Sequence, residues 1–291
     1  MWQAIEQAIS GALGEQFTVT SARAVGGGCI NQAMHLQGKS RSVFLKLNGV
    51  DRLEMFSAEA AGLCAIRASN TVRAPEPIAW GVDGQSSWLA LEFLALQPAR
   101  AESAFQLGKQ LAAMHAHTAA GFGWDRDNTI GATPQPNQWT RDWVTFLREQ
   151  RIGHQLGLAR DNGLPAATHD RVEQVQSALP RLFDVYQPRP SLLHGDLWGG
   201  NWAVESGGHP VVFDPAVYYG DREADLAMTE LFGGFDRGFY EAYRRTWPLD
   251  SGYDVRRDLY QLYHILNHFN LFGGGYAGQV RALADRLLAN C

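Results

Sequence analysis

The sequence is poor in cysteine, has no excess of basic residues and contains no long apolar run, and each absence excludes a class of protein. Its three cysteines, Cys29, Cys64 and Cys291, lack the spacing of a metal site and fit a reducing compartment better than a disulfide scaffold. A net charge of −5 argues against a nucleic-acid-binding protein, since these are usually basic. No segment approaches the ~18 apolar residues of a membrane helix, and the first residues lack the regions of a signal peptide. We therefore expect a cytoplasmic protein without nucleic-acid or membrane partners.

What the sequence does contain is enough apolar material for a globular protein of two domains or lobes. Of its 291 residues, 45% are hydrophobic and 19% are charged, which is ordinary for soluble proteins. Strand-like segments surround one helix in the first part, whereas the remainder is mainly helical. We expect an α+β fold with a small antiparallel-sheet N-terminal lobe, residues 1–94, and a larger helical C-terminal lobe, residues 95–291, with the ligand in the cleft between them.

The expected elements follow from hydrophobic periodicity and from Gly and Pro breaks. Gln97-Pro98 is the expected hinge between the lobes, and a loop rich in Gly, Pro and Asn is expected over 121–138. The strands are expected at 17–25, 31–37, 42–47 and 87–94, and the helices at 52–68, 103–117, 139–152, 169–185, 222–232, 236–246, 254–271 and 276–289.

The most specific pattern lies in the segment from His194 to Asn201 and in the aspartate that follows it. Asp196 and Asn201 have the spacing of a kinase catalytic loop, and Asp214 follows a short strand-like run, as the metal carboxylate of kinases does. Asp196 could accept the proton of a substrate hydroxyl, while Asn201 and Asp214 could hold Mg²⁺, which prefers oxygen ligands. A polar turn between two strands is the plainer interpretation, but the combined spacing favours phosphoryl transfer. His194 is expected to support the loop backbone.

A lysine and a glutamate upstream predict the nucleotide half of such a site. Lys46 lies in a strand-like segment, where it could contact the α- and β-phosphates of ATP or simply face solvent at a sheet edge. Glu59 falls on the apolar stripe of the helix that follows, and a carboxylate there is costly unless it is paired. We therefore expect an ion pair between Lys46 and Glu59.

The glycine-rich segment Gly26-Gly27-Gly28-Cys29-Ile30-Asn31 precedes that lysine. Glycines such as Gly27 and Gly28 allow backbone N–H groups to approach phosphate oxygens closely. The segment is neither G-x-G-x-x-G, because Asn31 replaces the last glycine, nor a Walker loop. A hairpin turn explains it equally well, so its position before Lys46 is what favours ATP binding.

Two further segments are weaker candidates. Glu92-Phe93-Leu94 ends the last strand of the first lobe, where kinases bind adenine through backbone groups, although an ordinary strand end fits as well. On the C-terminal helix, four polar side chains could reach a substrate or could be solvated, and the sequence does not separate these options: His264, Asn267, His268 and Asn270.

Taken together, the motifs resemble those of the fructosamine kinases, also called ketosamine-3-kinases, within the aminoglycoside-phosphotransferase-like kinases of protein-kinase-like fold. Trp198-Gly199-Gly200-Asn201 and the segment 220–228 narrow the resemblance beyond the wider superfamily, and it covers nearly the whole chain. The residues that carry it are Gly27-Gly28-Cys29-Ile30-Asn31, Phe44-Leu45-Lys46-Leu47, Phe56-Ser57-Ala58-Glu59, 194–202, Phe213-Asp214-Pro215-Ala216, 219–228 and 267–275.

The resemblance implies ATP- and Mg²⁺-dependent phosphorylation of the C3 hydroxyl of a ketosamine, a sugar joined to an amine such as a glycated lysine. The 3-phosphate then promotes loss of the sugar, which reverses glycation. Trp198 could stack on the sugar beside Asp196, or it could simply pack the loop, and His268 is a second candidate for substrate contact. We expect a monomer.

Two other functions compete with this one. A nucleotide-binding regulator with a dead site is disfavoured, because the five residues of the expected site are all present: Lys46, Glu59, Asp196, Asn201 and Asp214. A phosphotransferase for aminoglycosides, or for amino alcohols such as choline or homoserine, retains the chemistry but changes the acceptor. Polycationic aminoglycosides need an acidic cleft, which four carboxylates could supply: Asp221, Glu223, Asp225 and Glu230.

Cys29 lies in the expected phosphate loop. A thiol near backbone N–H groups and Lys46 could have a lowered pKa and be open to oxidation, which would give a redox-linked dimer or loss of ATP binding. The plainer interpretation is a small residue that fills a turn.

Overall fold

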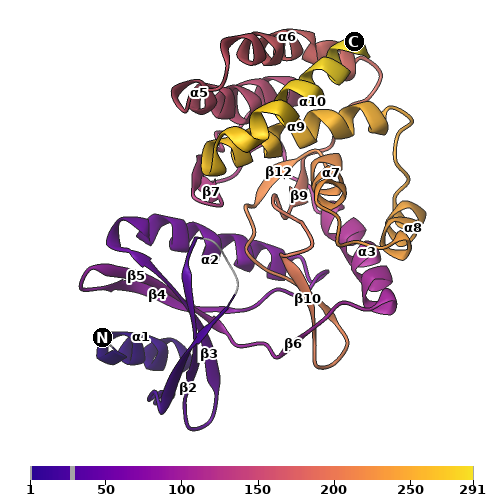
Figure 1. Cartoon of the computed structure of the whole chain (residues 1–291). Coiled ribbons are helices and arrows are strands. Elements are labelled where there is room, and N and C mark those ends of the chain that lie inside the picture. The colour runs from indigo at the N-terminus through magenta and orange to yellow at the C-terminus, as the bar shows by residue number, and fades with distance from the viewer. Residues whose placement is uncertain (1, 27–29, 291) are drawn as a thin grey trace.

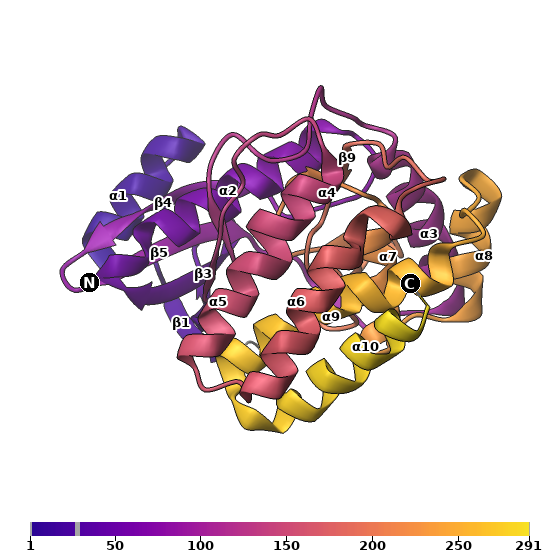
Figure 2. The same cartoon turned by 90° about the horizontal axis from the view of Figure 1, so that it is seen from above.

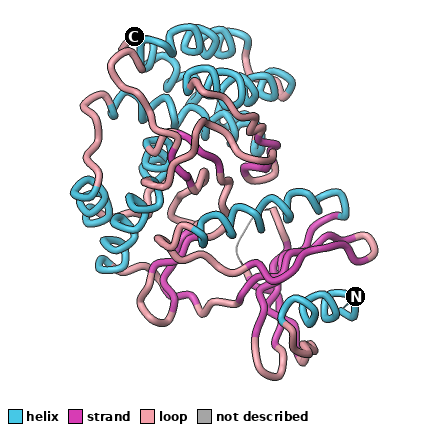
Figure 3. Tube along the Cα trace, turned by 180° about the vertical axis from the view of Figure 1, so that it is seen from behind, coloured by secondary structure: helices cyan, strands magenta, loops and turns pink. Residues whose placement is uncertain are grey.

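The strand-rich and helix-rich parts of the chain lie at opposite ends of the molecule. The computed structural model describes residues 2–26 and 30–290. One end holds the N-terminal sheet and the other holds most of the helices, and residues from both parts line one cavity (Figure 1). The tube in Figure 3 shows the same division, with the long strands together and the helices on the far side. The α+β arrangement is therefore confirmed, while the boundary between residues 94 and 95 stays a prediction.

The N-terminal part is a five-stranded antiparallel sheet with a helix on each face. The strand order is β1-β2-β3-β5-β4, with all neighbours antiparallel. Its elements are α1 (Trp2–Leu13), β1 (Ser21–Val25), β2 (Gln32–Gln37), β3 (Ser42–Gly49), the short 3₁₀ turn Val50–Arg52, α2 (Leu53–Ala68), β4 (Pro77–Asp83) and β5 (Ser86–Glu92).

Side-chain alternation along β5 divides the apolar residues between the two faces. Trp88 and Ala90 pack with α1, and Leu89 and Leu91 pack with α2, because successive side chains of a strand point to opposite faces. Strand β3 alternates likewise, so Leu45 is buried toward α1 while Lys46 points to the cavity side. The register of this strand thus determines the position of the lysine.

Helix α1 is the main element of this part that the sequence analysis did not anticipate. Its Ile5 and Ile9 are fully buried against the sheet, one helical turn apart. The sequence predicts a single helix in this part, at 52–68, whereas the structure has α1 as well, and the strand expected over 17–25 begins only at Ser21. The signal was present, since Trp2, Ile5, Ile9 and Leu13 follow a helical period.

The C-terminal part is mainly helical, with short strands that carry the motifs. Figure 2, seen from above, shows α5, α6, α9 and α10 grouped together, and Figure 1 places them at the end of the molecule away from the sheet. The elements are β6 (Leu96–Gln97), α3 (Ala101–His115), β7 (Asn128–Ile130), β8 (Thr133–Gln135), α4 (Trp143–Phe146), the π-helical turn Leu147–Gly153, α5 (His154–Asp161), α6 (Ala166–Leu182), β9 (Ser191–Leu193), β10 (Trp202–Glu205), β11 (Pro210–Val212), β12 (Tyr218–Gly220), α7 (Glu223–Leu231), α8 (Arg237–Thr246), α9 (Tyr253–Phe272), the 3₁₀ turn Gly274–Tyr276 and α10 (Ala277–Ala289).

Two segments of this part differ from expectation. Gln97, expected in a hinge, lies in β6, which pairs with β10 at Val204, so the connection between the two parts belongs to a three-stranded sheet. The helix expected over 139–152 instead runs from Trp143 through the π-helical turn to Asp161. In both places tertiary packing, which the sequence pattern does not report, decides the local structure.

A hairpin interrupts the loop expected over 121–138. Strands β7 and β8 pair antiparallel, and their Thr129 pairs with Pro134. This β7–β8 hairpin lies against α2 of the N-terminal part as well as against the helical part. It therefore places polar side chains between the two parts, beside the cavity.

Candidate active site

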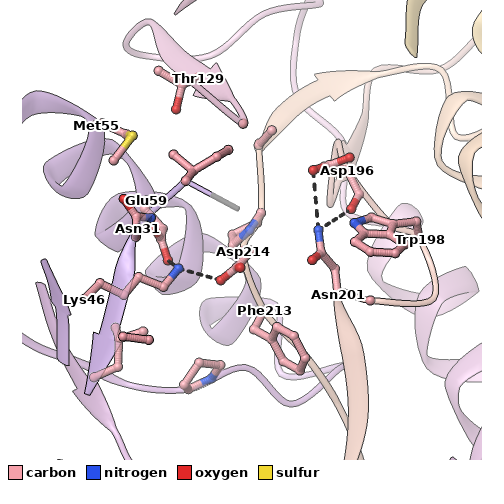
Figure 4. A pocket seen from close by; sticks show the side chains of 18 of the residues that line it. Asn31, Lys46, Met55, Glu59, Thr129, Asp196, Trp198, Asn201, Phe213 and Asp214 are labelled. Carbon is pink, nitrogen blue, oxygen red and sulfur yellow. Dashed lines mark hydrogen bonds and ion pairs between the residues drawn. The ribbon is translucent and has the colours of Figure 1, made fainter. Parts of the chain in front are cut away.

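The residues expected to perform the chemistry meet in one cavity of about 630 Å³. Lys46, Glu59, Asp196, Asn201 and Asp214 all line it, and Figure 4 shows their side chains. Other candidates line it as well: Glu92, Leu94, Trp198, Asn267 and His268. Gly27, Gly28 and Cys29 lie outside the described residues, so their roles stay predictions. Strands β3 and β9–β11 and helix α2 thus deliver the widely spaced motifs to a single site.

Lys46 is held between two carboxylates. Its Nζ lies 2.5 Å from Oε1 of Glu59 and 2.5 Å from Oδ1 of Asp214, so the expected ion pair forms and gains a second partner. The lysine is only 5% exposed. Burial alone would lower the pKa of Lys46, but the charges of Asp214 and Glu59 outweigh it and raise the pKa. The lysine is therefore a fixed positive charge between the sheet and the segment that carries Asp214.

The catalytic loop begins where β9 ends and is fixed by a buried carboxylate. Oδ2 of Asp225 accepts the backbone N–H of His194 at 2.7 Å, and Oδ1 accepts that of Gly195 at 2.8 Å. His115 Nε2 lies 3.1 Å from the same carboxylate. Burial opposes ionisation, but the hydrogen bond and charge of His115 still lower the pKa of Asp225. An ionised Asp225 thus holds the loop backbone in place.

Gly195 and His194 connect this loop to the segment that carries Asp214. Gly195 has a φ of +83°, and a Cβ there would lie 2.0 Å from the carbonyl oxygen of Ala216, so only glycine fits. His194 Nε2 lies 3.0 Å from the carbonyl oxygen of Phe213, and its Nδ1 accepts the backbone N–H of Asp196 at 3.3 Å. Burial lowers the pKa of His194, which keeps the ring neutral. His194 therefore supports the loop backbone, as the sequence predicts.

Asp196 lies in a setting suited to a proton acceptor. Burial, followed by the charges of Asp214 and Asp225, raises the pKa of its carboxyl group to about 7. Asn201 Nδ2 donates to the backbone carbonyl of Asp196 at 2.8 Å and to its Oδ2 at 3.4 Å. These bonds orient the carboxylate, and a base whose pKa lies near the working pH is effective in proton transfer.

Asn201 and Asp214 offer oxygen atoms that suit Mg²⁺. Because the Nδ2 of Asn201 is bonded to Asp196, its Oδ1 points elsewhere and can act as a ligand. Lys46 occupies Oδ1 of Asp214, yet the side chain of Asp214 is 46% exposed, which leaves its second oxygen accessible. Asp214 also adopts a φ of +56°, a left-handed conformation that aims it away from a regular strand. An amide oxygen and a carboxylate oxygen form a hard donor set that fits this ion.

The part of the cavity lining that includes Trp198 and His268 is aromatic and neutral, and Figure 4 shows Trp198 beside Asn201, across the cavity from Lys46. Trp198 is 40% exposed there, and His268 lies among three aromatic rings, with centroid distances of 4.7 Å to Phe232, 5.6 Å to Phe272 and 5.3 Å to Tyr276. His268 Nδ1–H donates to the carbonyl of His264 at 2.8 Å, and burial lowers the pKa of His268. The ring is thus neutral, with the lone pair of Nε2 available to accept a hydrogen bond.

The four polar residues of α9 separate into two pairs. Asn267 and His268 line the cavity, whereas His264 and Asn270 do not. Burial lowers the pKa of His264 to about 3, and Asn270 donates to Gln155 at 2.7 Å. Only the first pair can contact a substrate in this cavity.

The four carboxylates that could have supplied an acidic acceptor cleft for an aminoglycoside do not line the cavity. Asp221 accepts from Tyr260 and Tyr186, Glu223 binds Arg256 at 2.7 Å, and Glu230 accepts from Tyr253 at 2.8 Å. Asp225 supports the catalytic loop instead. A helix start with several acidic residues suggested an anionic surface, but its side chains are turned inward and paired.

At the strand end, the side chains of Glu92 and Phe93 make contacts within the protein. Glu92 Oε1 lies 2.5 Å from Arg73, whose Nε is 3.8 Å from Glu205 in β10. Phe93 does not line the cavity; its ring stacks on His35 at 4.0 Å. Leu94 does line it. The adenine contact expected here therefore depends on main-chain groups and stays a prediction.

Sequence reasoning missed the contribution of the β7–β8 hairpin. Asn128 and Thr129 line the cavity, and Figure 4 shows Thr129 among the residues around it. The available signal was length, since loops beyond about 12–15 residues without structure are uncommon and usually functional.

Comparison with known proteins agrees with this geometry. The family model described as fructosamine kinase matches residues 1–290. A probable ketoamine kinase of Synechocystis is 48% identical over 295 residues, covering 100% of this chain and 96% of that protein. The crystal structure of a candidate fructosamine-3-kinase of Haemophilus somnus has a TM-score of 0.91 at 30% identity, covering 99% of this chain and 98% of the other.

A more distant likeness confirms the fold. A thermostable aminoglycoside phosphotransferase mutant, solved with ADP and hygromycin B, has a TM-score of 0.64 at 16% identity and covers 99% of this chain and 98% of its own. The fold is therefore protein-kinase-like. Within the described residues, no helix combines the length and hydropathy needed to cross a membrane. The family model and the identities above establish that this chain belongs to the fructosamine kinase family.

Proposed function

We propose that this enzyme transfers the γ-phosphoryl group of ATP to the C3 hydroxyl of ketosamines, and that it thereby acts in deglycation. The observation that supports this most directly is the convergence of Lys46, Asp214, Asn201 and Asp196 in one cavity with a neutral, aromatic acceptor end. The names of its relatives, a ketoamine kinase and a candidate fructosamine-3-kinase, agree with the acceptor and with the position of transfer.

The nucleotide would lie on the sheet side of the cavity. Lys46, held by Glu59, would bind the α- and β-phosphates, and the glycines of the 26–31 segment, including Gly27 and Gly28, would supply backbone N–H groups. Adenine would contact main-chain groups of Glu92, Phe93 and Leu94. Asn201 and Asp214 would hold Mg²⁺, which when bound neutralises charge on the phosphate oxygens.

Asp196 would act on the acceptor. Its carboxylate accepts the proton of the C3 hydroxyl as that oxygen bonds to the γ-phosphorus, and the bond from phosphorus to the β-phosphate oxygen breaks. The products are ADP, a ketosamine 3-phosphate and a proton held on Asp196. Because the transition state is loose, the main task of the side chains is to orient the hydroxyl and to place charge.

The acceptor end favours a substrate with a single positive charge. The secondary ammonium of a ketosamine could donate to Nε2 of His268 and lie beside the ring of Phe272, which lines the cavity, because aromatic rings attract cations. Trp198 offers an apolar face for the sugar. The carboxylates that a polycationic aminoglycoside would require are turned into the protein core. We further propose that glycated lysines on proteins are substrates. We also propose that the enzyme is a monomer and acts in the cytoplasm.

One assay tests the proposal. ATP consumption would be measured with ribulosamine, fructosamine and erythrulosamine acceptors, and with an aminoglycoside and choline as rivals, for the wild type and Asp196→Asn. We expect turnover with ketosamines, product carrying phosphate at C3, and a large loss in the variant. Turnover with the rivals alone, or equal turnover by both proteins, would contradict it. No turnover with any acceptor, despite ATP binding, would favour the regulator.

A further inference from the structure

The β7–β8 hairpin contains a buried glutamine that the proposed reaction does not use directly. We propose that Gln135 is a positioning residue. It fixes three parts of the site relative to one another: the catalytic loop around Asp196, the segment from Asp214 to Ala216, and the acceptor wall, which is the part of α9 that carries Asn267 and His268. The inference rests on the proposed function for its effect on turnover. Gln135 is 1% exposed, so each of its polar atoms needs a partner within the protein.

Its partners come from three separate segments. Nε2 donates to Oδ1 of Asn128 at 2.8 Å and to the carbonyl oxygen of Ala216 at 3.2 Å. Oε1 accepts the hydroxyl of Tyr263, on α9, at 2.5 Å. A single planar amide therefore connects the hairpin, the segment after Asp214 and the helix that carries the acceptor-side residues.

Ala216 is the point where the two catalytic segments meet. Its backbone N–H donates to the carbonyl of His194 at 2.8 Å, and its carbonyl oxygen lies against the Cα of Gly195. Asp196 follows Gly195 directly, and Asp214 precedes Ala216 by two residues. A shift of the Ala216 carbonyl would consequently displace both the proposed base and a proposed metal ligand.

The hairpin itself is held firmly. Asn128 Nδ2 donates to the carbonyl of Val217 at 2.8 Å, and Asn128 Oδ1 also accepts from Asn137 at 2.8 Å. Arg151, fully buried, donates to Asn137 Oδ1 at 2.6 Å and lies 4.0 Å from the ring centroid of Tyr218. Gln135 therefore extends from a hairpin that is itself fixed by hydrogen bonds, so it can hold the Ala216 carbonyl in place.

Tyr263 extends the same support to the acceptor side. It lies one helical turn before Asn267, which lines the cavity, on α9. Burial raises the pKa of the Tyr263 hydroxyl well above its usual value, so the group stays a hydrogen-bond donor to Gln135. The side chain of Gln135 is therefore hydrogen-bonded both to α9, which forms the acceptor wall, and to the segment that follows Asp214.

The test compares Gln135→Met with a matched control, Gln261→Met. Methionine retains length and flexibility but removes the amide. Gln261 is 9% exposed, also lies in the core, and donates to the carbonyl of Ala227 at 3.1 Å, away from Ala216. Tyr263→Phe is a milder third variant that removes one partner of Gln135 only. Thermal unfolding of all three would show the stability cost of each change.

We expect kcat of Gln135→Met to fall about 10- to 100-fold with little change in the KM of ATP, since small misplacements of reacting groups cost rate more than binding. Tyr263→Phe should show a smaller fall in the same parameter. Gln261→Met, which removes one buried hydrogen bond, should keep its kcat even though it lowers stability. Equal kcat for Gln135→Met and Gln261→Met would overturn the inference.

A second measurement does not depend on the acceptor. ATP binding would be followed by calorimetry across a Mg²⁺ titration, and Gln135→Met should need several-fold more Mg²⁺ for half-maximal tightening, because Asp214 is displaced. An unchanged titration, with unchanged kcat, contradicts the positioning role. If the wild type transfers nothing to ketosamines, the proposed function fails, while the Mg²⁺ titration still decides the inference about Gln135.

Discussion

The two ends of the cavity hold their polar groups in different ways. At the phosphate end, Lys46, Glu59 and Asp214 form a charged cluster, and Asp196 lies beside it. At the acceptor end, a neutral His268, Asn267 and aromatic rings line the wall. Phosphoryl transfer needs fixed charges around the phosphates whatever the acceptor is, whereas recognition of a particular sugar depends on shape and neutral contacts. The phosphate end should therefore determine kcat, and the acceptor end should determine the KM of the ketosamine.

The substitution with the largest expected effect on kcat is Asp196→Asn, at the phosphate end. We expect kcat to fall by about 10²- to 10⁴-fold, the usual contribution of a general base, with the affinity for ATP nearly unchanged. Asparagine retains the size of the side chain and can still contact Asn201. Steady-state rates with the best ketosamine, together with calorimetric ATP binding, would measure both quantities. A parallel loss of ATP affinity would mean that Asp196 organises the phosphate end as a whole.

Lys46→Met should have the next largest effect. Removal of the cation leaves Glu59 and Asp214 without their common partner, and we expect kcat/KM for ATP to fall about 100-fold. The KM of the ketosamine should change little. Arg67→Met is a control, because Arg67 lies on α2, as Glu59 does, but its contacts among the described residues are with Ala74 and Glu76, and it does not line the cavity. An effect on acceptor KM as large as that on ATP would contradict the division between the two ends.

The sequence predicted the phosphate end better than the acceptor end, and the reason is physical. Asp196 and Asn201 are close in sequence, so their spacing fixes their geometry within one loop. Lys46 and Glu59 lie on adjacent elements whose periodicity is visible. Gln135 and Tyr263, by contrast, are 128 residues apart, and no local pattern brings them together.

Distance along the chain also explains why the sequence left the acidic-cleft alternative open. Asp221, Glu223, Asp225 and Glu230 carry charge, but the sequence does not show that tyrosine, arginine and histidine side chains from other segments pair with them. Helix α1 obeyed a clear period and could have been found. The order of strands and helices could be predicted from the sequence. Strand β6 and the β7–β8 hairpin could not, because they form where segments distant in the sequence pair with them or pack against them.

A change at the acceptor end should have a smaller and different effect. His268→Phe retains an aromatic ring among Phe232, Phe272 and Tyr276 but removes the Nε2 acceptor. We expect the KM of ketosamines to rise about 10-fold, the effect of one hydrogen bond to a charged group, with kcat and the KM of ATP nearly unchanged. His268→Gln should recover part of the affinity. A fall in kcat with unchanged KM would instead place His268 in the phosphate-transfer machinery.

The smallest expected effect concerns stability, and it arises from the raised pKa of Asp196. Burial and the charges of Asp214 and Asp225 raise the pKa of its carboxyl group from the usual 3.8 to about 7 in the folded protein, so the folded state holds the proton more tightly. That contribution to stability is complete at low pH and is lost as pH rises through about 7. The full shift corresponds to about 4 kcal/mol, but Asp196 is partly exposed, so water reduces the cost. Asp196→Asn should thus stabilise the enzyme, free of nucleotide and metal, by about 1 kcal/mol or roughly 2 °C at pH 8, and by much less at pH 5. Thermal unfolding in chelator at both pH values measures this difference. An equal gain at the two pH values would show that asparagine packs better and that ionisation of Asp196 does not lower stability. A gain confined to high pH would show that the ionised carboxylate, the form that can accept a proton, destabilises the folded protein.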